Sequence, residues 1–242
     1  MSTLEGMLRE VAERFAPAAL ASSLQAEDMV ITDAIARLRL PLGVFVLDTG
    51  RLNEETLALI PEIRQRYGLA VQVYEPQAGA VANYVQFYGR DAFYRGLELR
   101  QRCCEIRKTE PLARALAGKR AWLTGQRREH SAGRTHLAER EFDALHGLEK
   151  FNPLVAWSEA AVWDYIREHH VPYNRLYDQG YRSIGCAPCT RPVQPGEDIR
   201  AGRWWWESPE TKECGLHVAP DGRLVRAKSG TDHVFSAPEV NA

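Results

Sequence analysis

Four of the five cysteines stand in two tight pairs, Cys103-Cys104 and Cys186-Ala-Pro-Cys189. Both thiolates of a Cys-x-x-Cys turn can reach one metal centre, which makes the second pair a compact chelating unit. Side chains of adjacent residues normally diverge, so an iron–sulfur cubane suits the vicinal pair better than one small ion. Four cysteinates fit a [4Fe–4S] cluster or a structural zinc, and the vicinal pair favours the cluster. The remaining interpretation is four small buried hydrophobic residues.

The fifth cysteine, Cys214, stands alone in the stretch Glu213-Cys-Gly-Leu-His217. This segment is polar and has little apolar periodicity, so we expect the thiol to be accessible. Lys212 and His217 favour the thiolate, which is the attacking form, whereas Glu213 opposes it. Cys214 is therefore a candidate nucleophile, and an incidental surface thiol is the alternative.

Two further features could bind anions. Lys108 lies four residues after Cys104, so on a helix both would share a face and the ammonium could offset an anionic metal centre. A solvated surface lysine is the alternative. Ser22 and Ser23 lead into a predicted helix near Asp28, and a helix N-terminus with hydroxyls binds phosphate-like groups. The two serines could equally be helix caps, and the segment lacks the glycines and the Gly-Lys-Ser/Thr ending of a Walker loop.

Arginines gather in two places. Arg127, Arg128 and Arg134 lie in a polar loop, and Arg200 and Arg203 lie near the C-terminus. Guanidinium forks bind sulfate and phosphate through two parallel hydrogen bonds. We expect these residues to bind an oxyanion, and solvated loop charge is the alternative.

The elements that must position these residues alternate along the chain. Helical periodicity marks residues 4–15, 29–38, 53–67, 80–88, 104–116 and 158–170, with Asn53 and Ser158 as predicted N-caps. Apolar segments within 43–50, 70–76 and 120–125 predict strands, and a short apolar run covers 18–24. Such alternation predicts βαβ units, right-handed crossovers and a parallel α/β sheet with helices on both faces.

Ligands of such sheets bind beyond the carboxyl ends of the strands. Polar turns within 22–28, 47–51 and 124–134 follow three of the apolar segments, so we expect them to share one rim and form one site. Asp48-Thr49-Gly50 could hold a ribose hydroxyl or an adenine amine there, or form an ordinary Asx turn. We divide the chain into a nucleotide-binding part, 1–180, and an irregular C-terminal flap, 181–242, within the same structural unit.

Composition excludes several classes of protein. The 242 residues are 45% hydrophobic with a formal charge of −1, so the chain can bury a core and has no global field that attracts nucleic acid. We see no run of 18 apolar residues and no secretory signal, and therefore expect no membrane span and a reducing cytosol. In that compartment, paired cysteines more often hold a metal or do redox chemistry than form structural disulfides.

Taken together, the two cysteine pairs, Leu47-Asp-Thr-Gly50, the loop at 124–134 and the Glu213–His217 stretch resemble the assimilatory sulfonucleotide reductases. More narrowly, they are similar to the bacterial adenylylsulfate (APS) reductases, from about residue 22 to 217. The resemblance implies an adenine nucleotide α-hydrolase-like, PP-loop-like core. The stretch from Ser22 to Asp28 lacks the paired glycines of ATP pyrophosphatases, which argues against ATP cleavage. Family members with both cysteine pairs carry a [4Fe–4S] cluster and generally prefer APS over its 3′-phosphorylated form, PAPS.

The resemblance also implies a mechanism. The Cys214 thiolate attacks the sulfur of APS, AMP leaves, and thioredoxin or a glutaredoxin-like dithiol releases sulfite from the cysteine S-sulfonate. Lys108 and His217 would assist, and Cys103, Cys104, Cys186 and Cys189 would hold the cluster. The expected substrate-binding residues are Ser22, Ser23, Gln25, Glu27, Asp28, Leu47, Asp48, Thr49, Gly50, Gly125, Gln126, Arg127, Arg128, Arg200 and Arg203.

Three alternatives stay open at this point. The first is the same reaction on PAPS, which needs a basic pocket at the ribose 3′ position. The second is a PP-loop nucleotidyl enzyme, such as a tRNA-thiolating protein, which predicts ATP binding and a basic RNA face. The third is a non-enzymatic metal-binding redox sensor, and the sequence leaves a homo-oligomer possible.

Overall fold

The computed structural model of the protein describes residues 3–130 and 136–208. Within these residues a six-stranded sheet has the order β3-β2-β1-β4-β6-β5. Its strands are β1 Ala18–Ser22, β2 Gly43–Leu47, β3 Val71–Tyr74, β4 Ala121–Leu123, β5 Arg140–Asp143 and β6 Leu148–Phe151. All neighbouring strands run parallel except β5, which pairs antiparallel with β6.

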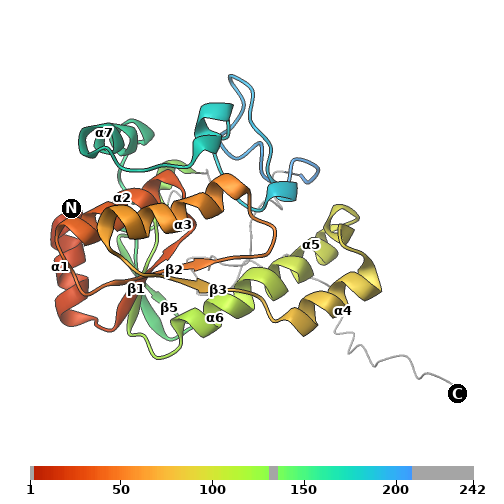
Figure 1. The fold of residues 1–242 in the computed structure, drawn as a ribbon, viewed down its shortest axis with the longest axis horizontal. Helices are drawn as coiled ribbons and strands as arrows, with labels where there is room; N and C mark the ends of the chain where they lie inside the picture. The colour runs from red at the N-terminus through yellow and green to blue at the C-terminus, as the bar shows by residue number, and fades with distance from the viewer. Residues whose placement is uncertain (1–2, 131–135, 209–242) are drawn as a thin grey trace, which may run out of the picture.

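Helices cover both faces of the sheet, as predicted (Figure 1). They are α1 Leu4–Arg14, α2 Ala26–Arg37, α3 Glu54–Tyr67, α4 Ala78–Tyr88, α5 Leu97–Cys104, α6 Glu110–Leu116 and α7 Glu159–His169. One core lies between the sheet and α1, α2, α3 and α7, and includes Leu20, Met29 and Val46. A second lies under α6 and includes Phe45 and Leu112. Each of these fully buried side chains stabilises the fold by about 1.5–3 kcal/mol.

The helix boundaries follow local signals. Ser158 caps α7 by accepting a hydrogen bond from the Ala161 amide at 3.1 Å. Gly68 ends α3 in the left-handed conformation, at φ +67°. Asn53 occupies the N-cap position of α3, but within the described residues its side chain makes no capping hydrogen bond. The predicted N-cap position of Asn53 is thus confirmed, without a capping hydrogen bond from its side chain.

Two parts of the chain differ from the prediction. The single helix expected over 104–116 is α5 and α6 joined by a π-helical turn, Glu105–Thr109. The sheet is not wholly parallel, because β5 pairs antiparallel with β6 at its edge. This β5–β6 hairpin was not predicted. That hairpin turns at Asp143, whose carboxylate accepts the Leu145 and His146 amides, and at Gly147, with φ +69°.

The strand order places the switch point of the sheet between β1 and β4. From β1 the chain moves outward through β2 and β3, whereas β4 begins the other half. The segment after residue 180 crosses this rim: the Ile184 amide donates to Gln25 Oε1 at 2.7 Å, and the Ala187 amide donates to the Arg51 carbonyl at 2.7 Å. Among the helices of the described residues, we find none with the length and apolar character needed to cross a bilayer.

Candidate active site

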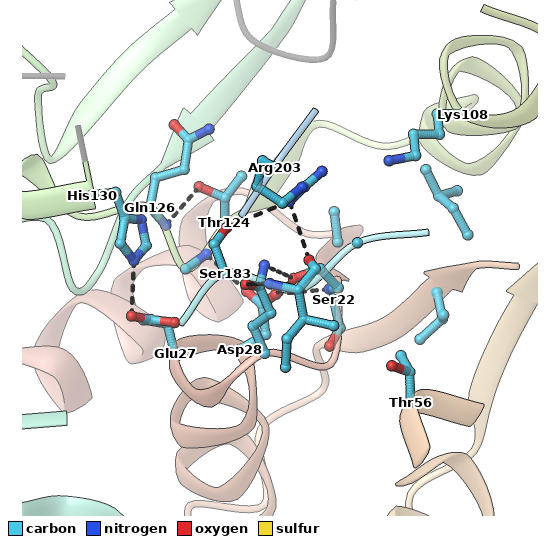
Figure 2. Close-up of a pocket in the computed structure, with 18 of the residues that line it drawn as sticks. Ser22, Glu27, Asp28, Thr56, Lys108, Thr124, Gln126, His130, Ser183 and Arg203 are labelled. Carbon is cyan, nitrogen blue, oxygen red and sulfur yellow. Dashed lines mark hydrogen bonds and ion pairs between the residues drawn. The ribbon is translucent and has the colours of Figure 1, made fainter. Parts of the chain in front are cut away.

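A cavity of about 190 Å³ opens at the carboxyl ends of β1, β2 and β4 (Figure 2). The three strand-end turns therefore meet at one rim. The predicted residues that line the cavity are Ser22, Ser23, Gln25, Glu27, Asp28, Leu47, Thr49, Lys108, Gly125, Gln126, Arg200 and Arg203.

One wall of the cavity is apolar. Phe45, Leu47, Leu112 and Trp122 line it, and of these Phe45 and Leu112 are fully buried. Flat apolar walls of this kind accommodate a planar base by stacking and dispersion. The cavity therefore combines a slot for a base with polar turns on either side.

Asp28 joins two of the turns. Its Oδ2 accepts hydrogen bonds from the Ser23 amide at 2.7 Å and the Ser23 hydroxyl at 2.6 Å, and its Oδ1 accepts one from the Gly125 amide at 2.9 Å. Burial raises the pKa of Asp28 to about 6, against the opposing effect of these hydrogen bonds. The contacts of the carboxylate make Asp28 a group that positions the turns after β1 and β4.

Gly125 approaches helix α2 closely. A Cβ built on it would lie 2.5 Å from Asp28 Oδ1 and 2.8 Å from Glu27 Cβ, distances that side chains do not tolerate. The absence of a side chain at 125 thus allows the β4 turn to donate its amide to Asp28.

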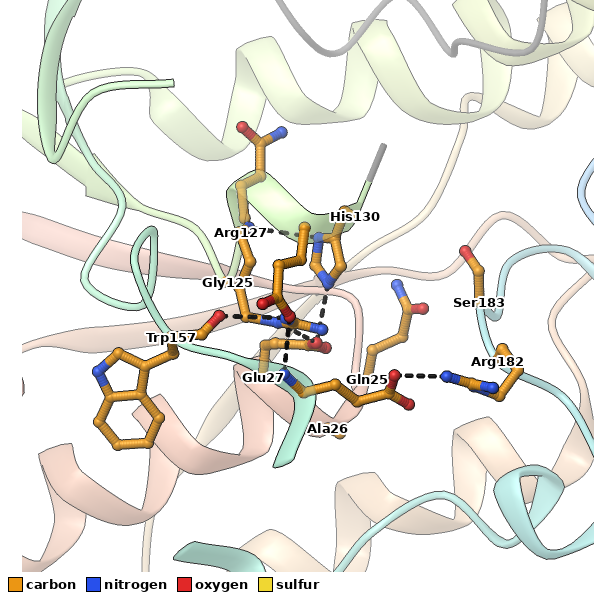
Figure 3. Close-up of polar contacts among 12 residues, drawn as sticks. Gln25, Ala26, Glu27, Gly125, Arg127, His130, Trp157, Arg182 and Ser183 are labelled. Carbon is orange, nitrogen blue, oxygen red and sulfur yellow. Dashed lines mark hydrogen bonds and ion pairs between the residues drawn. The ribbon is translucent and has the colours of Figure 1, made fainter. Parts of the chain in front are cut away.

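Glu27 forms the centre of a second polar group (Figure 3). Its Oε1 meets Arg127 Nε and His130 Nε2, both at 2.8 Å. Burial raises the pKa of Glu27, but His130 and Arg127 outweigh this effect and lower the pKa to about 2. The carboxylate is therefore ionised and fixed at the edge of the cavity.

In the loop at 124–134, Arg127 and Arg128 contact protein groups, and their role in substrate binding stays a prediction. Arg127 is buried, and its Nη1 donates to Glu129 at 3.0 Å and to the Trp157 carbonyl at 3.2 Å. Arg128 donates from Nε to the Leu137 carbonyl at 3.0 Å. Neither belongs to the lining that the described residues form, and Arg134 lies outside those residues.

Two cationic side chains, Lys108 and Arg203, also line the cavity. Figure 2 shows Lys108 across the pocket from Glu27 and His130, with Arg203 between them. Arg203 Nη1 donates to the Ile184 carbonyl at 3.2 Å, and its guanidinium lies 4.6 Å from the Trp204 ring centroid. Lys108 comes from the π-helical turn, a distortion that often occurs at functional sites.

The turn after β2 contributes through its backbone and Thr49. Asp48 Oδ1 accepts the Gly50 amide at 2.9 Å, which is the Asx turn left open above. Arg107 Nη1 donates to the Thr49 carbonyl at 2.6 Å, and Thr49 Oγ1 lies 3.2 Å from Cys186 Sγ. Asp48 and Gly50 shape this turn, while Leu47 and Thr49 reach the cavity.

A second, smaller cavity lies beside the first, and the four paired cysteines line it. All four are free thiols. Burial raises the pKa of Cys103, and it raises that of Cys189 to about 12. Among the described residues, no three His, Cys, Asp or Glu side chains are arranged around a single metal ion. Lys108 lines this cavity as well as the larger one.

Sequence reasoning missed some of the lining. His130, Arg182 and Ser183 also reach the larger cavity. Their signal was weak, because His130 stands among the charges of the arginine loop and the other two precede the Cys186 pair without a motif of their own. Two predicted catalytic residues, Cys214 and His217, lie outside the described residues.

Known proteins resemble this chain over most of its length. The family model of the phosphoadenosine phosphosulfate reductase domain matches residues 17–192. The adenosine 5′-phosphosulfate reductase of Allochromatium vinosum is 57% identical over 87% of this chain and 82% of its own length. That of Burkholderia cepacia is 54% identical over 95% of this chain and 92% of its own length.

Solved structures agree in fold. The phosphoadenylyl-sulfate reductase of Candida auris, in a phosphate complex, superimposes with a TM-score of 0.68 at 28% identity, over 79% of this chain and 91% of that chain. The FMN adenylyltransferase of Candida glabrata, in complex with FAD and inorganic pyrophosphate, gives a TM-score of 0.54 at 14% identity, over 90% of this chain and 78% of that chain. The second likeness concerns the fold alone.

Proposed function

Because this chain belongs to the phosphoadenosine phosphosulfate reductase family, we propose that it reduces adenosine 5′-phosphosulfate (APS) to sulfite and AMP. One observation carries the proposal: Lys108 lines both the larger cavity and the cavity of four cysteines. The relatives named APS reductase, which match 87% and 95% of this chain, support APS as the substrate.

The charges of the cavity suit this substrate. The adenine fits the apolar wall near Phe45 and Trp122, at the switch point of the sheet. The phosphosulfate then faces the Lys108 ammonium and the guanidinium forks of Arg200 and Arg203, which bind sulfate and phosphate oxygens. These cations reduce the repulsion between an anionic substrate and an approaching thiolate.

Cys214 is the proposed nucleophile. Cys214 lies ten positions after Trp204, which lines the cavity, and ten residues of extended chain span up to about 33–36 Å, so the thiol can reach the substrate. Its thiolate attacks the sulfur of APS, an S–S bond forms, the S–O bond to the phosphate breaks, and AMP leaves with that electron pair. Lys108, Arg200 and Arg203 stabilise the negative charge that builds on the leaving phosphate, with His217 assisting.

The product is a cysteine S-sulfonate, which a dithiol reductant resolves. One thiol of thioredoxin, or of a glutaredoxin-like protein, attacks Cys214 Sγ, and sulfite leaves. The second thiol of the reductant then breaks the mixed disulfide and restores the Cys214 thiol. The two electrons come from the dithiol, so the reaction belongs in a reducing compartment such as the cytosol.

Cys103, Cys104, Cys186 and Cys189 are the proposed ligands of a [4Fe–4S] cluster. Their donor chemistry fits, because four thiols line one cavity together with Lys108 and Arg107. When bound, the cluster supplies a compact negative charge beside the cations. Lys108 then helps to balance that charge on one side while it faces the substrate on the other.

The same reaction on PAPS is the second candidate. The Candida auris structure favours it, because that protein is a phosphoadenylyl-sulfate reductase with 28% identity to this chain. The bacterial relatives named APS reductase are about twice as similar in identity, which favours APS.

Mass spectrometry of the intact protein tests the proposal. Protein purified without oxygen is assayed for iron and acid-labile sulfide and incubated with APS, PAPS or ATP. We expect a sulfonate on Cys214 with APS, and its loss in Cys214→Ser with unchanged iron content. A sulfonate on another cysteine, or none with either sulfonucleotide, would contradict the proposal.

A further inference from the structure

Charged side chains of both signs line the larger cavity. Lys108 lies across it from Glu27, which is beside the turn after β4 (Figure 2). Arg182 also lines the cavity, but it is paired with Glu159. A phosphosulfate is attracted to Lys108, so the carboxylate of Glu27 suits an uncharged part of the nucleotide.

Glu27 is held too firmly to move away from a ligand. Its side chain is 10% exposed, and Arg127 and His130 both contact its Oε1 at 2.8 Å from the same loop (Figure 3). Arg127 also pairs with Glu129 at 3.0 Å, so one guanidinium is shared between two carboxylates. The positive charge of Arg127 is thus divided between Glu27 and Glu129, and His130 also contacts the Glu27 carboxylate.

We propose that Glu27 is a specificity-determining residue that admits an unphosphorylated ribose and excludes a nucleotide with a phosphate on the ribose 3′ oxygen. The inference rests on the proposed function and deepens it. A ribose hydroxyl donates a hydrogen bond to a carboxylate, whereas a 3′-phosphate brings two negative charges toward it. An acidic residue selects an unphosphorylated ribose by the same chemistry in dinucleotide-binding folds.

The position of Glu27 agrees with this role. It lies in the first turn of α2, between the Ser22-Ser23 turn and Gly125, at the switch point where a nucleotide crosses the sheet. The ribose connects the base to the 5′-phosphate, so in this binding mode it lies between the apolar wall and Lys108, in the cavity that Glu27 also lines.

Binding of products tests the inference without the chemical step. Isothermal calorimetry compares AMP with adenosine 3′,5′-bisphosphate on the full-length, cluster-loaded protein and on Glu27→Gln. We expect the wild type to bind AMP at least about tenfold more tightly, and Glu27→Gln to reduce that ratio by about tenfold. An unchanged ratio in Glu27→Gln overturns the inference.

Glu129→Gln is the matched control. It removes one carboxylate charge that pairs with Arg127, as Glu27→Gln does. The Glu129 side chain, however, is 54% exposed and does not belong to the lining that the described residues form. We expect it to leave the ratio within about twofold of the wild type. Equal effects of the two substitutions would mean that the ratio responds to the Arg127 network in general, and would overturn the inference.

A ligand series on the wild type covers the case in which Glu27→Gln does not fold. 3′-O-methyl-AMP blocks the same oxygen without adding charge, so we expect it to bind clearly more tightly than the bisphosphate. If 3′-O-methyl-AMP and the bisphosphate both bind equally more weakly than AMP, exclusion is by size, and the role of the Glu27 charge is overturned. If APS forms the sulfonate on Cys214 and AMP binds, but Glu27→Gln does not change the ratio of AMP to bisphosphate affinity, only this inference fails. If APS forms no sulfonate and AMP does not bind, the proposed function fails as well.

Discussion

Asp28 and Gly125 are joined by a hydrogen bond of 2.9 Å, from the Gly125 amide to the Asp28 carboxylate. The same carboxylate holds Ser23 through two further hydrogen bonds. One buried side chain therefore sets the spacing of the turns after β1 and β4, the two strands that flank the switch point.

Asp28 should make stability depend on pH. Its pKa is raised from 3.8 to about 6, so its contribution is fully present below pH 3.8 and is lost as the pH rises through 6. Relative to Asp28→Asn, the wild type should lose roughly 2 kcal/mol of unfolding free energy between about pH 4 and 6. Urea unfolding at a series of pH values measures this difference, with iron content followed at each pH. A difference that does not vary with pH would show that Asp28 titrates normally.

Gly125→Ala should impair both stability and nucleotide binding. The new Cβ would lie 2.5 Å from Asp28 Oδ1, so the turn or α2 must shift. Overpacking of this kind destabilises by about 1–3 kcal/mol, and we expect weaker AMP binding as well. Gly79→Ala in α4 is the control, because no described atom lies within 4 Å of its Cβ position. Thermal unfolding should show Gly79→Ala equal to or above the wild type, and a Gly125→Ala protein that behaves the same way would contradict the close approach.

Much of the fold could be predicted from the sequence because its signals are local. The apolar run that became β2 and the capped amphipathic helix α7 carry their own periodicity and boundaries. The β5–β6 hairpin does not, since β5 is a four-residue edge strand, Arg-Glu-Phe-Asp, without a continuous apolar face. The π-helical turn within 104–116 was also missed, because it uses the same residue types as an α-helix.

The site could be predicted only as far as topology dictates it. Parallel strands bring their carboxyl ends to one edge, so the turns at Ser22 and Thr49 were expected to meet. The direction of each arginine could not be predicted, because Arg127 and Arg128 look equivalent in the sequence. Arg127 is buried and pairs with the Glu27 carboxylate, 100 positions away in the sequence. This contact exists only after the sheet has formed.

Lys108→Met should slow the chemical step while the iron content is retained. Lys108 is the cation that lines both cavities, and a preorganised cation acts on charge that develops in the transition state. We expect single-turnover formation of the Cys214 sulfonate to fall by about 10²–10³-fold, with a smaller change in AMP binding. Lys119→Met is the control, since Lys119 follows α6 and does not belong to the described lining of either cavity. Equal rates in the two variants would remove Lys108 from the proposed mechanism.

Arg100 and Glu207 should stabilise the protein far more than an ordinary ion pair. Arg100 Nε and Nη2 contact the two Glu207 oxygens at 2.8 and 2.9 Å, and the side chains are 1% and 7% exposed. Arg100 also lies 4.6 Å from the Trp204 ring centroid, so the pair ties α5 to the segment after residue 200. Removing one partner leaves a buried charge, and we expect Arg100→Leu to lower the unfolding free energy by about 3–5 kcal/mol.

The same helix offers the control for this prediction. Arg102 pairs with Glu105 at 3.1 Å, but the two side chains are 60% and 54% exposed. Arg102→Leu should therefore change stability by less than about 1 kcal/mol. A double-mutant cycle of Arg100→Leu with Glu207→Leu separates the pair from its surroundings, and we expect the double variant to be more stable than either single one. If the stability losses of Arg100→Leu and Glu207→Leu were additive, the two side chains would contribute independently. The aromatic contacts alone would then hold α5 to the segment after residue 200.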